Sequence, residues 1–230
     1  MYYALLALPV VALAIWRVRK RQVRTARLRD CARERGLRFN RADILDLAAR
    51  YADTVLLQVG HSRRAWNTLC GMRDRRAWVG FLAQCDLGQG ADRLRLQRCM
   101  AVLEVPTGIE AVLLPVSSDE EHGFVRTPLG FLGFLPAPAY SPAADPSHAL
   151  FVRRPSLGDD PRTKRLAMAI RRYPREWTWE AGESLLLVAS PHRSESREDR
   201  ILGAMLDAVA DVAANVFAAD ARRVAPDTPT

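Results

Sequence analysis

The densest group of possible metal ligands in the chain is the run Asp-Glu-Glu-His at residues 119–122. A metal ion needs ligands that share one face, and adjacent residues rarely supply more than two of them. A Ser/His/Asp arrangement can be drawn from Ser117, His122 and Asp145, but no G-x-S-x-G nucleophile elbow supports it. The run is therefore more typical of an exposed acidic loop, and we predict neither a metal site nor a catalytic residue here.

The four cysteines also lack the spacing of a chemical site. Cys31, Cys70, Cys85 and Cys99 form no C-x-x-C pair, which argues against bound zinc. Cys85 and Cys99 fall within apolar segments with strand character, so we expect them to be small core residues. A cytoplasmic location would keep all four thiols reduced.

Histidines and glycines give no stronger signal. His61, His122, His148 and His192 are scattered through turn-like segments. The Gly-Gln-Gly sequence at residues 88–90 matches no phosphate-binding loop, because it joins two expected strands and does not lead into a helix. We predict no cofactor.

Trp177 and Trp179 alternate with charged or polar residues. Because side chains alternate across a strand, both indoles should face the same side. We expect them to pack in the core, and an exposed aromatic patch for a partner is the alternative.

Residues 2–16 contain no charge and have aromatic residues at both ends. Extended through Val18, a helix would be about 27 Å long at about 1.5 Å per residue, just under a hydrocarbon core of about 30 Å. Arg17 and Arg19 could snorkel, and Pro9 is tolerable at the cost of a kink. A secretory signal peptide fits the sequence less well, because such a peptide carries its positive charge before the apolar run and here the charge follows it. A buried core helix is a second alternative.

We therefore predict a transmembrane anchor at residues 1–18. Interfacial aromatic and basic side chains are expected where such an anchor leaves the bilayer. The candidate membrane-interface residues are Tyr2, Tyr3, Trp16, Arg17, Arg19, Lys20 and Arg21.

Positive charge is concentrated behind the anchor. Residues 1–50 carry 12 of the 34 basic residues and 4 of the 26 acidic ones, so the remainder holds 22 of each and is neutral. By the positive-inside rule the N-terminus should face out and the rest should lie in the cytoplasm, which predicts a single-pass protein of a bacterial inner membrane. The basic segment lies close to anionic headgroups, although its leading expected role is topology. The charge distribution argues against nucleic acid as a partner, because the folded body carries no excess of basic residues.

The periodicity of the remaining sequence predicts an α+β domain at residues 36–222. We expect a mainly antiparallel sheet packed with a long C-terminal amphipathic helix and preceded by the transmembrane helix. Expected helices are 19–35 (a basic juxtamembrane helix), one from Asn40 through Ala48, 161–170 behind an Asp160 cap, and 201–217 after Ser196 and Asp199. Expected strands are 54–59, 77–87, 94–105, 109–116, 149–153, 176–179 and 184–189. An irregular excursion is expected at residues 117–146 and a disordered tail at 223–230.

Several short motifs between residues 63 and 189 carry a family resemblance. They are Asn-Thr-Leu-Cys-Gly at 67–71, Asp86 before a glycine-containing turn, Leu-Leu-Pro at 113–115, and Trp-Thr-Trp-Glu at 177–180 followed by Gly182 and three leucines. The chain resembles a bacterial family of uncharacterised proteins with one N-terminal membrane helix and a cytoplasmic domain of unknown function. The resemblance implies architecture and location, and it provides no catalytic residues.

Three functions are compatible with these patterns. The first is a membrane-tethered interaction or regulatory module that contacts membrane lipids through the anchor and basic segment and binds an unknown protein partner. The alternative is a membrane-associated hydrolase or lipid-modifying enzyme with a site assembled from distant residues. Nucleic-acid binding through residues 17–41 is the third hypothesis.

Overall fold

The computed structural model describes residues 2–58, 60–90, 93–115, 129–137, 148–191 and 197–217, with side chains from residue 11 onward. The helices are α1 (Tyr2–Glu34), α2 (Leu47–Arg50), α3 (Val55–Gln58), α5 (Pro161–Ile170) and α6 (Glu198–Val216), with a short 3₁₀-helix at Pro155–Gly158. The strands are β1 (Arg38–Ala42), β2 (His61–Arg73), β3 (Arg76–Leu87), β4 (Leu94–Glu104), β5 (Ala111–Pro115), β6 (Leu135–Pro136), β7 (His148–Val152), β8 (Thr178–Gly182) and β9 (Leu185–Pro191).

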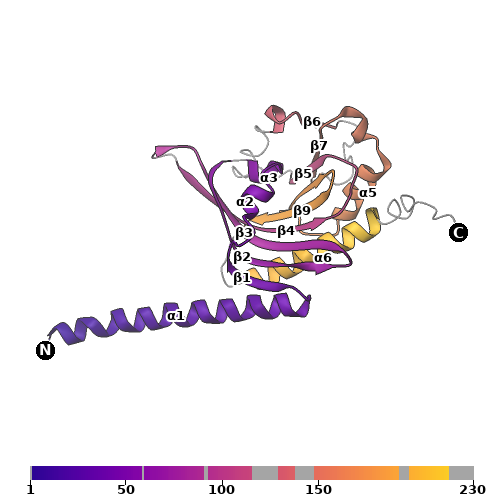
Figure 1. Ribbon diagram of the computed structural model, residues 1–230. Coiled ribbons are helices and arrows are strands. Elements are labelled where there is room, and N and C mark those ends of the chain that lie inside the picture. Colours follow the sequence, from indigo (N-terminus) through magenta and orange to yellow (C-terminus); the bar gives the residue numbers. More distant parts are fainter. Residues whose placement is uncertain are drawn as a thin grey trace.

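These strands form one sheet in the order β1-β2-β3-β4-β9-β8-β5-β7-β6, and each neighbouring pair is antiparallel. Helix α6 packs along one face, and α2 and α3 cover part of the other (Figure 1). The α+β class with a mainly antiparallel sheet, expected from the order of the apolar segments, is confirmed.

The central strands are buried on both faces, which explains their nearly continuous apolar sequences. In β4, Cys99, Ala101 and Leu103 pack toward α6, while Met100 and Val102 pack on the opposite face. Helix covers both sides of β4, so both sets of side chains leave water.

Helices α5 and α6 follow the expected patterns. The Asp160 carboxylate accepts a hydrogen bond from the Arg162 backbone amide at 2.7 Å, and Pro161 occupies the first helical position. This confirms the predicted cap and start of α5. Helix α6 buries one continuous stripe that includes Leu202, Met205 and Val209.

The helix predicted to begin at Asn40 is wrong. Asn40 lies in β1, the strand at one edge of the sheet, and pairs with Thr68 of β2. Pairing with β2 therefore takes the place of a helix at this position. Helix α2 begins only at Leu47, whose backbone amide donates to the Asp43 carboxylate at 2.8 Å. Strand β2 itself was not among the predicted strands.

The strand predicted at residues 54–59 is also wrong, because residues 55–58 form helix α3. The backbone amides of Val55 and Leu56 donate to the Glu180 carboxylate at 2.7 and 3.1 Å. A partner 125 residues away in the sequence thus satisfies the first amides of this helix, which local apolar content does not reveal. The strands expected at 176–179 and 184–189 are found as the antiparallel pair β8 and β9, although β8 begins two residues later and continues to Gly182. Gly182 pairs with Leu185, so the turn falls at residues 183–184.

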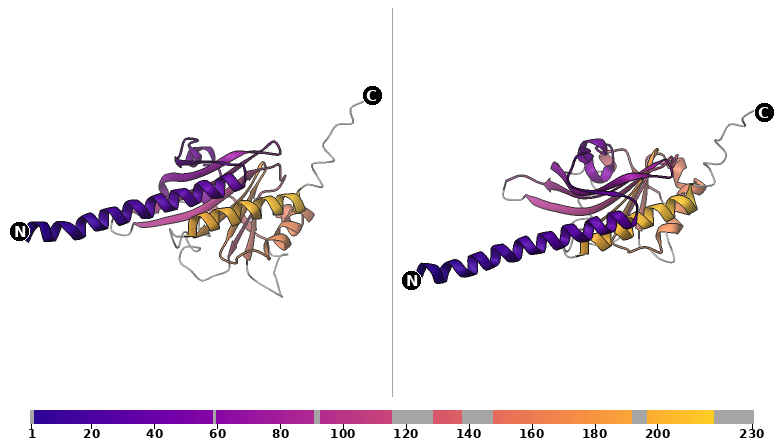
Figure 2. Two further views of the ribbon diagram at one scale, coloured as in Figure 1. Left: turned by 90° about the horizontal axis from the view of Figure 1, so that it is seen from below. Right: turned by 60° about the horizontal axis from the view of Figure 1, so that its bottom comes forward.

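Helix α1 is continuous from the apolar run into the basic segment, and Gly36, with φ +68°, follows its end. A positive φ is a common way to end a helix, and glycine adopts it without steric cost. Both views in Figure 2 show the N-terminal part of α1 projecting beyond the sheet, while its C-terminal part lies beside α6. Among the helical segments with described side chains, none combines the length and apolar character needed to cross a membrane.

Some sequence expectations fall outside the described residues. They include most of the excursion at 117–146, Ser196 and the tail at 223–230. The expected start of α6 behind Ser196 is wrong, because Arg197 occupies the N-cap without a side-chain capping hydrogen bond and Asp199 lies in the first turn. Within the excursion the structure describes residues 129–137, where Leu129 and Phe134 are buried and Phe131 is 89% exposed.

Candidate functional site

The C-terminal half of α1 is fixed to the domain by burial and by charge. Leu28, Cys31 and Ala32 are buried against the α6 face of the sheet. Arg24 forms a bidentate pair with Glu198 at the start of α6, with both N···O distances at 2.5 Å. Glu198 is 1% exposed, so this pair joins the two helices in a largely dry environment.

A second bidentate pair lies about three turns beyond Arg24, at the residue that follows the end of α1. Arg35 donates to Asp207 of α6 at 3.0 and 2.7 Å. The guanidinium crosses α6 at Gly203, where a Cβ atom would lie only 2.8 Å from an Arg35 nitrogen. The absence of a side chain at Gly203 therefore gives Arg35 room to reach Asp207, and α1 and α6 are held together at both ends of their contact.

The apolar side chains of α1 between residues 11 and 18 have no such cover. Val11, Leu13, Ile15, Trp16 and Val18 are each between 46% and 57% exposed. Exposed apolar surfaces of this kind are typical of sites that contact a protein or a membrane.

A basic cleft opens where this exposed part of α1 passes strands β1 and β2. Its volume is about 510 Å³. It is lined by Trp16, Arg17, Lys20, Arg21, Arg24, Thr25, Arg41, Trp66 and Asn67. Five of these nine residues are basic and none is acidic, so the cleft is suited to an anion.

The charges of the basic cleft are only partly neutralised. Arg24 is paired with Glu198, and the Lys20 ammonium lies 5.5 Å from the centre of the Trp16 ring. Within the described parts of the chain, Arg17, Arg21 and Arg41 have no ion-pair partner. Three guanidinium groups are thus available to a ligand that enters the cleft.

The far wall of the cleft is set by an irregularity in β2. The β2–β3 register shifts between Trp66 and Leu69, and Asn67 has a φ of +52°. A bulge bends a strand and redirects side chains, and asparagine tolerates a left-handed backbone better than most residues. Ala42 pairs with Trp66 across β1 and β2, which brings the neighbouring Arg41 into the same wall.

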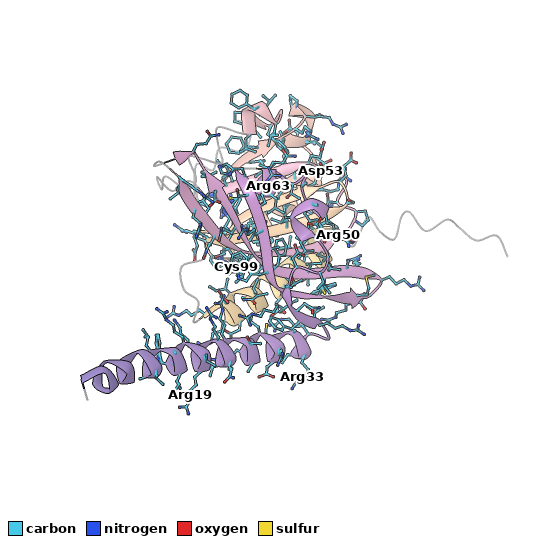
Figure 3. The ribbon with its side chains drawn as sticks, turned by 60° about the vertical axis from the view of Figure 1, so that its left-hand side comes forward. Arg19, Arg33, Arg50, Asp53, Arg63 and Cys99 are labelled. Carbon is cyan, nitrogen blue, oxygen red and sulfur yellow. The ribbon has the colours of Figure 1, made fainter. Side chains whose placement is uncertain are left out.

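Some of the predicted membrane-interface residues line the basic cleft and others do not. Trp16, Arg17, Lys20 and Arg21 line the basic cleft, whereas Arg19 does not. Figure 3 shows Arg19 extending from α1 on the side away from the sheet, as Arg33 does further along. Tyr2 and Tyr3 lie in α1, but their side chains are outside the described part of the structure.

The predicted membrane-interface residues do not include Arg41, Trp66 and Asn67, which complete the lining of the cleft. The high density of basic residues up to Arg41 was a partial signal. The contribution of Trp66 and Asn67 requires knowledge of the β1–β2 pairing, which no local pattern provides.

A second cleft, of about 620 Å³, lies where α2 and α3 meet strands β4, β8 and β9, and we call it the acidic cleft. Its charged lining residues are Arg50, Asp53, Glu104, Glu110, Arg153, Glu180 and Glu183. Arg50 and Asp53 mark its α2–α3 side in Figure 3. Arg50 donates to Glu104 at 2.8 Å and Arg153 donates to Glu110 at 2.7 Å, so internal pairs account for much of its charge.

Glu180 is the most deeply buried carboxyl group of the acidic cleft. Burial raises its pKa to about 7, and the amides of Val55 and Leu56 together with nearby Arg153 oppose this shift. Each carboxylate oxygen accepts a hydrogen bond from one of these two amides. The arrangement favours a structural role, in which Glu180 fixes α3 to β8.

The other candidate residues do not form a chemical site. Cys85 and Cys99 are buried, as expected, and burial raises the pKa of the Cys99 thiol to about 12. His148 is buried, and its Nε2 lies 2.8 Å from the Trp177 carbonyl oxygen. His61 is exposed at the start of β2, and its Nε2 lies 2.8 Å from the Gly88 carbonyl oxygen. In the described residues, no group of three or more His, Cys, Asp or Glu side chains could hold a metal ion. Ser117, residues 119–122, Asp145 and His192 lie outside the described parts.

Trp177 and Trp179 are both in the core. They are 5% and 0% exposed, and their ring centres lie 6.3 Å apart, next to Tyr173. The expectation that both indoles share one buried side is confirmed, and the alternative of an exposed aromatic patch is wrong.

The fold and the cleft therefore define an α+β domain with a projecting, apolar and basic N-terminal helix. No family model matches the chain, and no curated protein matches its sequence. The fold is similar to that of a solved structure, the mycobacterial trehalose monomycolate transport factor A. The two chains are 14% identical, with a TM-score of 0.52 over 83% of this chain and 94% of the other. At this identity the comparison establishes a shared fold.

Proposed function

We propose that this chain is a single-pass, membrane-tethered interaction module of a bacterial inner membrane. In this proposal the N-terminus lies outside and the α+β domain lies in the cytoplasm, where it binds a protein partner. One observation carries the proposal: α1 is a single helix that exposes apolar side chains between residues 11 and 18 and whose C-terminal part is bound into the domain.

The exposed side chains from Val11 to Val18 continue the uncharged run that begins at residue 2. In a bilayer this surface would be covered by lipid, which removes the cost of exposing it to water. The seven basic residues between 17 and 29 would then stay on the cytoplasmic side.

The neutral body of the domain and its covered sheet favour an interaction role for the domain. The protein that shares the fold is named as a transport factor, which supports a non-catalytic role here. A membrane-associated hydrolase or lipid-modifying enzyme is the alternative, and the buried Glu180 is the observation that favours it. Both oxygens of that carboxylate accept hydrogen bonds from backbone amides, however, which favours a structural role for Glu180. The interaction module is therefore the better-supported proposal.

Fractionation of cells that express the full chain tests the tether. The wild-type protein is expected to stay in the membrane pellet after an alkaline carbonate wash. Val11→Arg should shift it toward the soluble fraction, because an arginine near the bilayer centre costs about 3 kcal/mol. Val23→Arg is the matched control, since Val23 lies on the same helix and is 51% exposed, against 53% for Val11.

Release of the wild-type chain by carbonate would contradict the tether. Equal retention of the Val11→Arg and Val23→Arg variants, with wild-type retention intact, would show that the apolar run is not what holds the protein in the membrane.

A further inference from the structure

We propose that the basic cleft binds the phosphate of an anionic phospholipid headgroup from the membrane that holds α1. This inference rests on the proposed tether, and it adds a defined binding site to what would otherwise be a general attraction of basic residues to the bilayer.

The first argument is the chemistry of the lining. Arg17 and Arg21 of α1 face a cleft whose opposite wall carries Arg41, and all three lack an ion-pair partner among the described residues. Guanidinium groups bind phosphate oxygens in bidentate fashion, which a lone ammonium cannot do. Because no acidic side chain lines the cleft, an anion can compensate these charges without displacing an existing pair.

The second argument is the depth of the cleft relative to the bilayer. Arg21 lies about 8 Å beyond Trp16 along α1 at about 1.5 Å per residue. The headgroup layer extends about 5–8 Å on each side of the hydrocarbon core. With Trp16 at the end of the apolar run, the cleft therefore opens within the headgroup layer, which favours a lipid phosphate as its occupant.

Both walls of the cleft are attached to the folded domain. Trp66 packs against the main core, and α1 is fixed by its paired Arg24. The left-handed backbone of Asn67 keeps the β2 wall bent at the cleft. Indole rings are amphipathic and are enriched at membrane interfaces, and Trp16 and Trp66 both contribute to the lining.

Native mass spectrometry of the full chain in detergent tests the proposal. The protein is titrated with phosphatidylglycerol, phosphatidylcholine, inorganic phosphate and a short DNA duplex. We expect one phosphatidylglycerol to bind more tightly than phosphatidylcholine. Arg41→Gln should weaken phosphatidylglycerol binding about fivefold and Arg21→Gln with Arg41→Gln about 25-fold, since each basic residue near the surface contributes about 1 kcal/mol.

Arg38→Gln is the matched control for Arg41→Gln. Arg38 is also an exposed residue of β1, but it lies three positions away, on the other side of the strand from Arg41, and does not line the cleft. It should leave lipid binding unchanged. If Arg41→Gln fails to fold, Arg21→Gln on the exposed part of α1 tests the same cleft.

Several results would overturn the proposal. They are equal binding of the two lipids, no effect of the cleft variants, inorganic phosphate binding as tightly as the lipid, or tighter binding of the DNA duplex. The outcome is separable from that of the tether. Selective phosphatidylglycerol binding by a chain that carbonate releases would leave the cleft intact and remove the tether, and retention without lipid selectivity would do the reverse.

Discussion

Glu180 shows how one buried acid can determine the local structure of a distant segment. Its carboxylate accepts hydrogen bonds from the first two amides of α3. Desolvation by burial raises the pKa of this carboxyl group to about 7. Because this value lies above that of about 4.3 in an unfolded chain, the folded protein binds the proton more strongly. The resulting stabilisation is fully present below about pH 4 and is lost as the pH rises through about 7.

We therefore expect the free energy of unfolding of the wild-type chain to fall by about 2 kcal/mol between about pH 5.5 and pH 8 on account of this group. Glu180→Gln should remove that part of the pH dependence, since glutamine does not titrate. Glu183→Gln, an exposed acid in the following turn, should leave it in place. Denaturant titration followed by tryptophan fluorescence measures all three proteins. An unchanged pH dependence in Glu180→Gln would contradict the assignment.

At the scale of elements, the contact between α1 and α6 depends on the pair of Arg24 and Glu198, in which the Glu198 side chain is 1% exposed and the Arg24 side chain is 22% exposed. Removing one partner of a buried pair leaves an uncompensated charge and typically costs 3–5 kcal/mol. Glu198→Ala should lower the free energy of unfolding by about 3 kcal/mol, measured by chemical denaturation of the full chain. The double substitution Arg24→Met with Glu198→Leu should recover most of this loss, because neither charge then remains buried.

Asp30 provides the comparison for this prediction. It pairs with Arg33 on the outer side of α1, where both side chains are at least 60% exposed. Asp30→Ala should change the stability by less than about 1 kcal/mol. An equal effect of Asp30→Ala and Glu198→Ala would show that burial does not determine the strength of the α1–α6 contact.

The elements that could be predicted from the sequence are those with local signals. The β3–β4 hairpin and α6 have long apolar patterns, and α5 has an Asp-Pro start. Strand β2 was missed because its first half is polar and exposed and its register is broken near Asn67. Residues 55–58 were misassigned because a short apolar run is compatible with either a helix or a strand. The helix is favoured by a hydrogen bond to Glu180, which lies 125 residues away in the sequence.

The same limit applies to the candidate site. Four of its residues, Trp16, Arg17, Lys20 and Arg21, lie close together in the sequence at the end of an apolar run, so the sequence could group them. The opposite wall comes from Arg41 and the β2 bulge, whose position depends on pairing between β1 and β2. Long-range strand register is not encoded in any single segment.

At the scale of the whole molecule, charge and hydrophobicity are separated along one axis. Exposed apolar side chains lie between residues 11 and 18 of α1. The basic residues without an ion-pair partner among the described residues lie where α1 meets the sheet, and residues 51–230 carry no net charge. Because Arg24 and Arg35 fix α1 to α6, the domain should keep a defined orientation relative to the membrane. This arrangement is the basis of the proposed tether and of the lipid site.

The most direct test of this account is the topology of the full chain in a bacterial cell. A C-terminal reporter that is active on only one side of the inner membrane should be active in the cytoplasm, with the protein in the membrane fraction. Activity on the periplasmic side would place the basic cleft and the domain on the wrong face of the bilayer and would contradict the account.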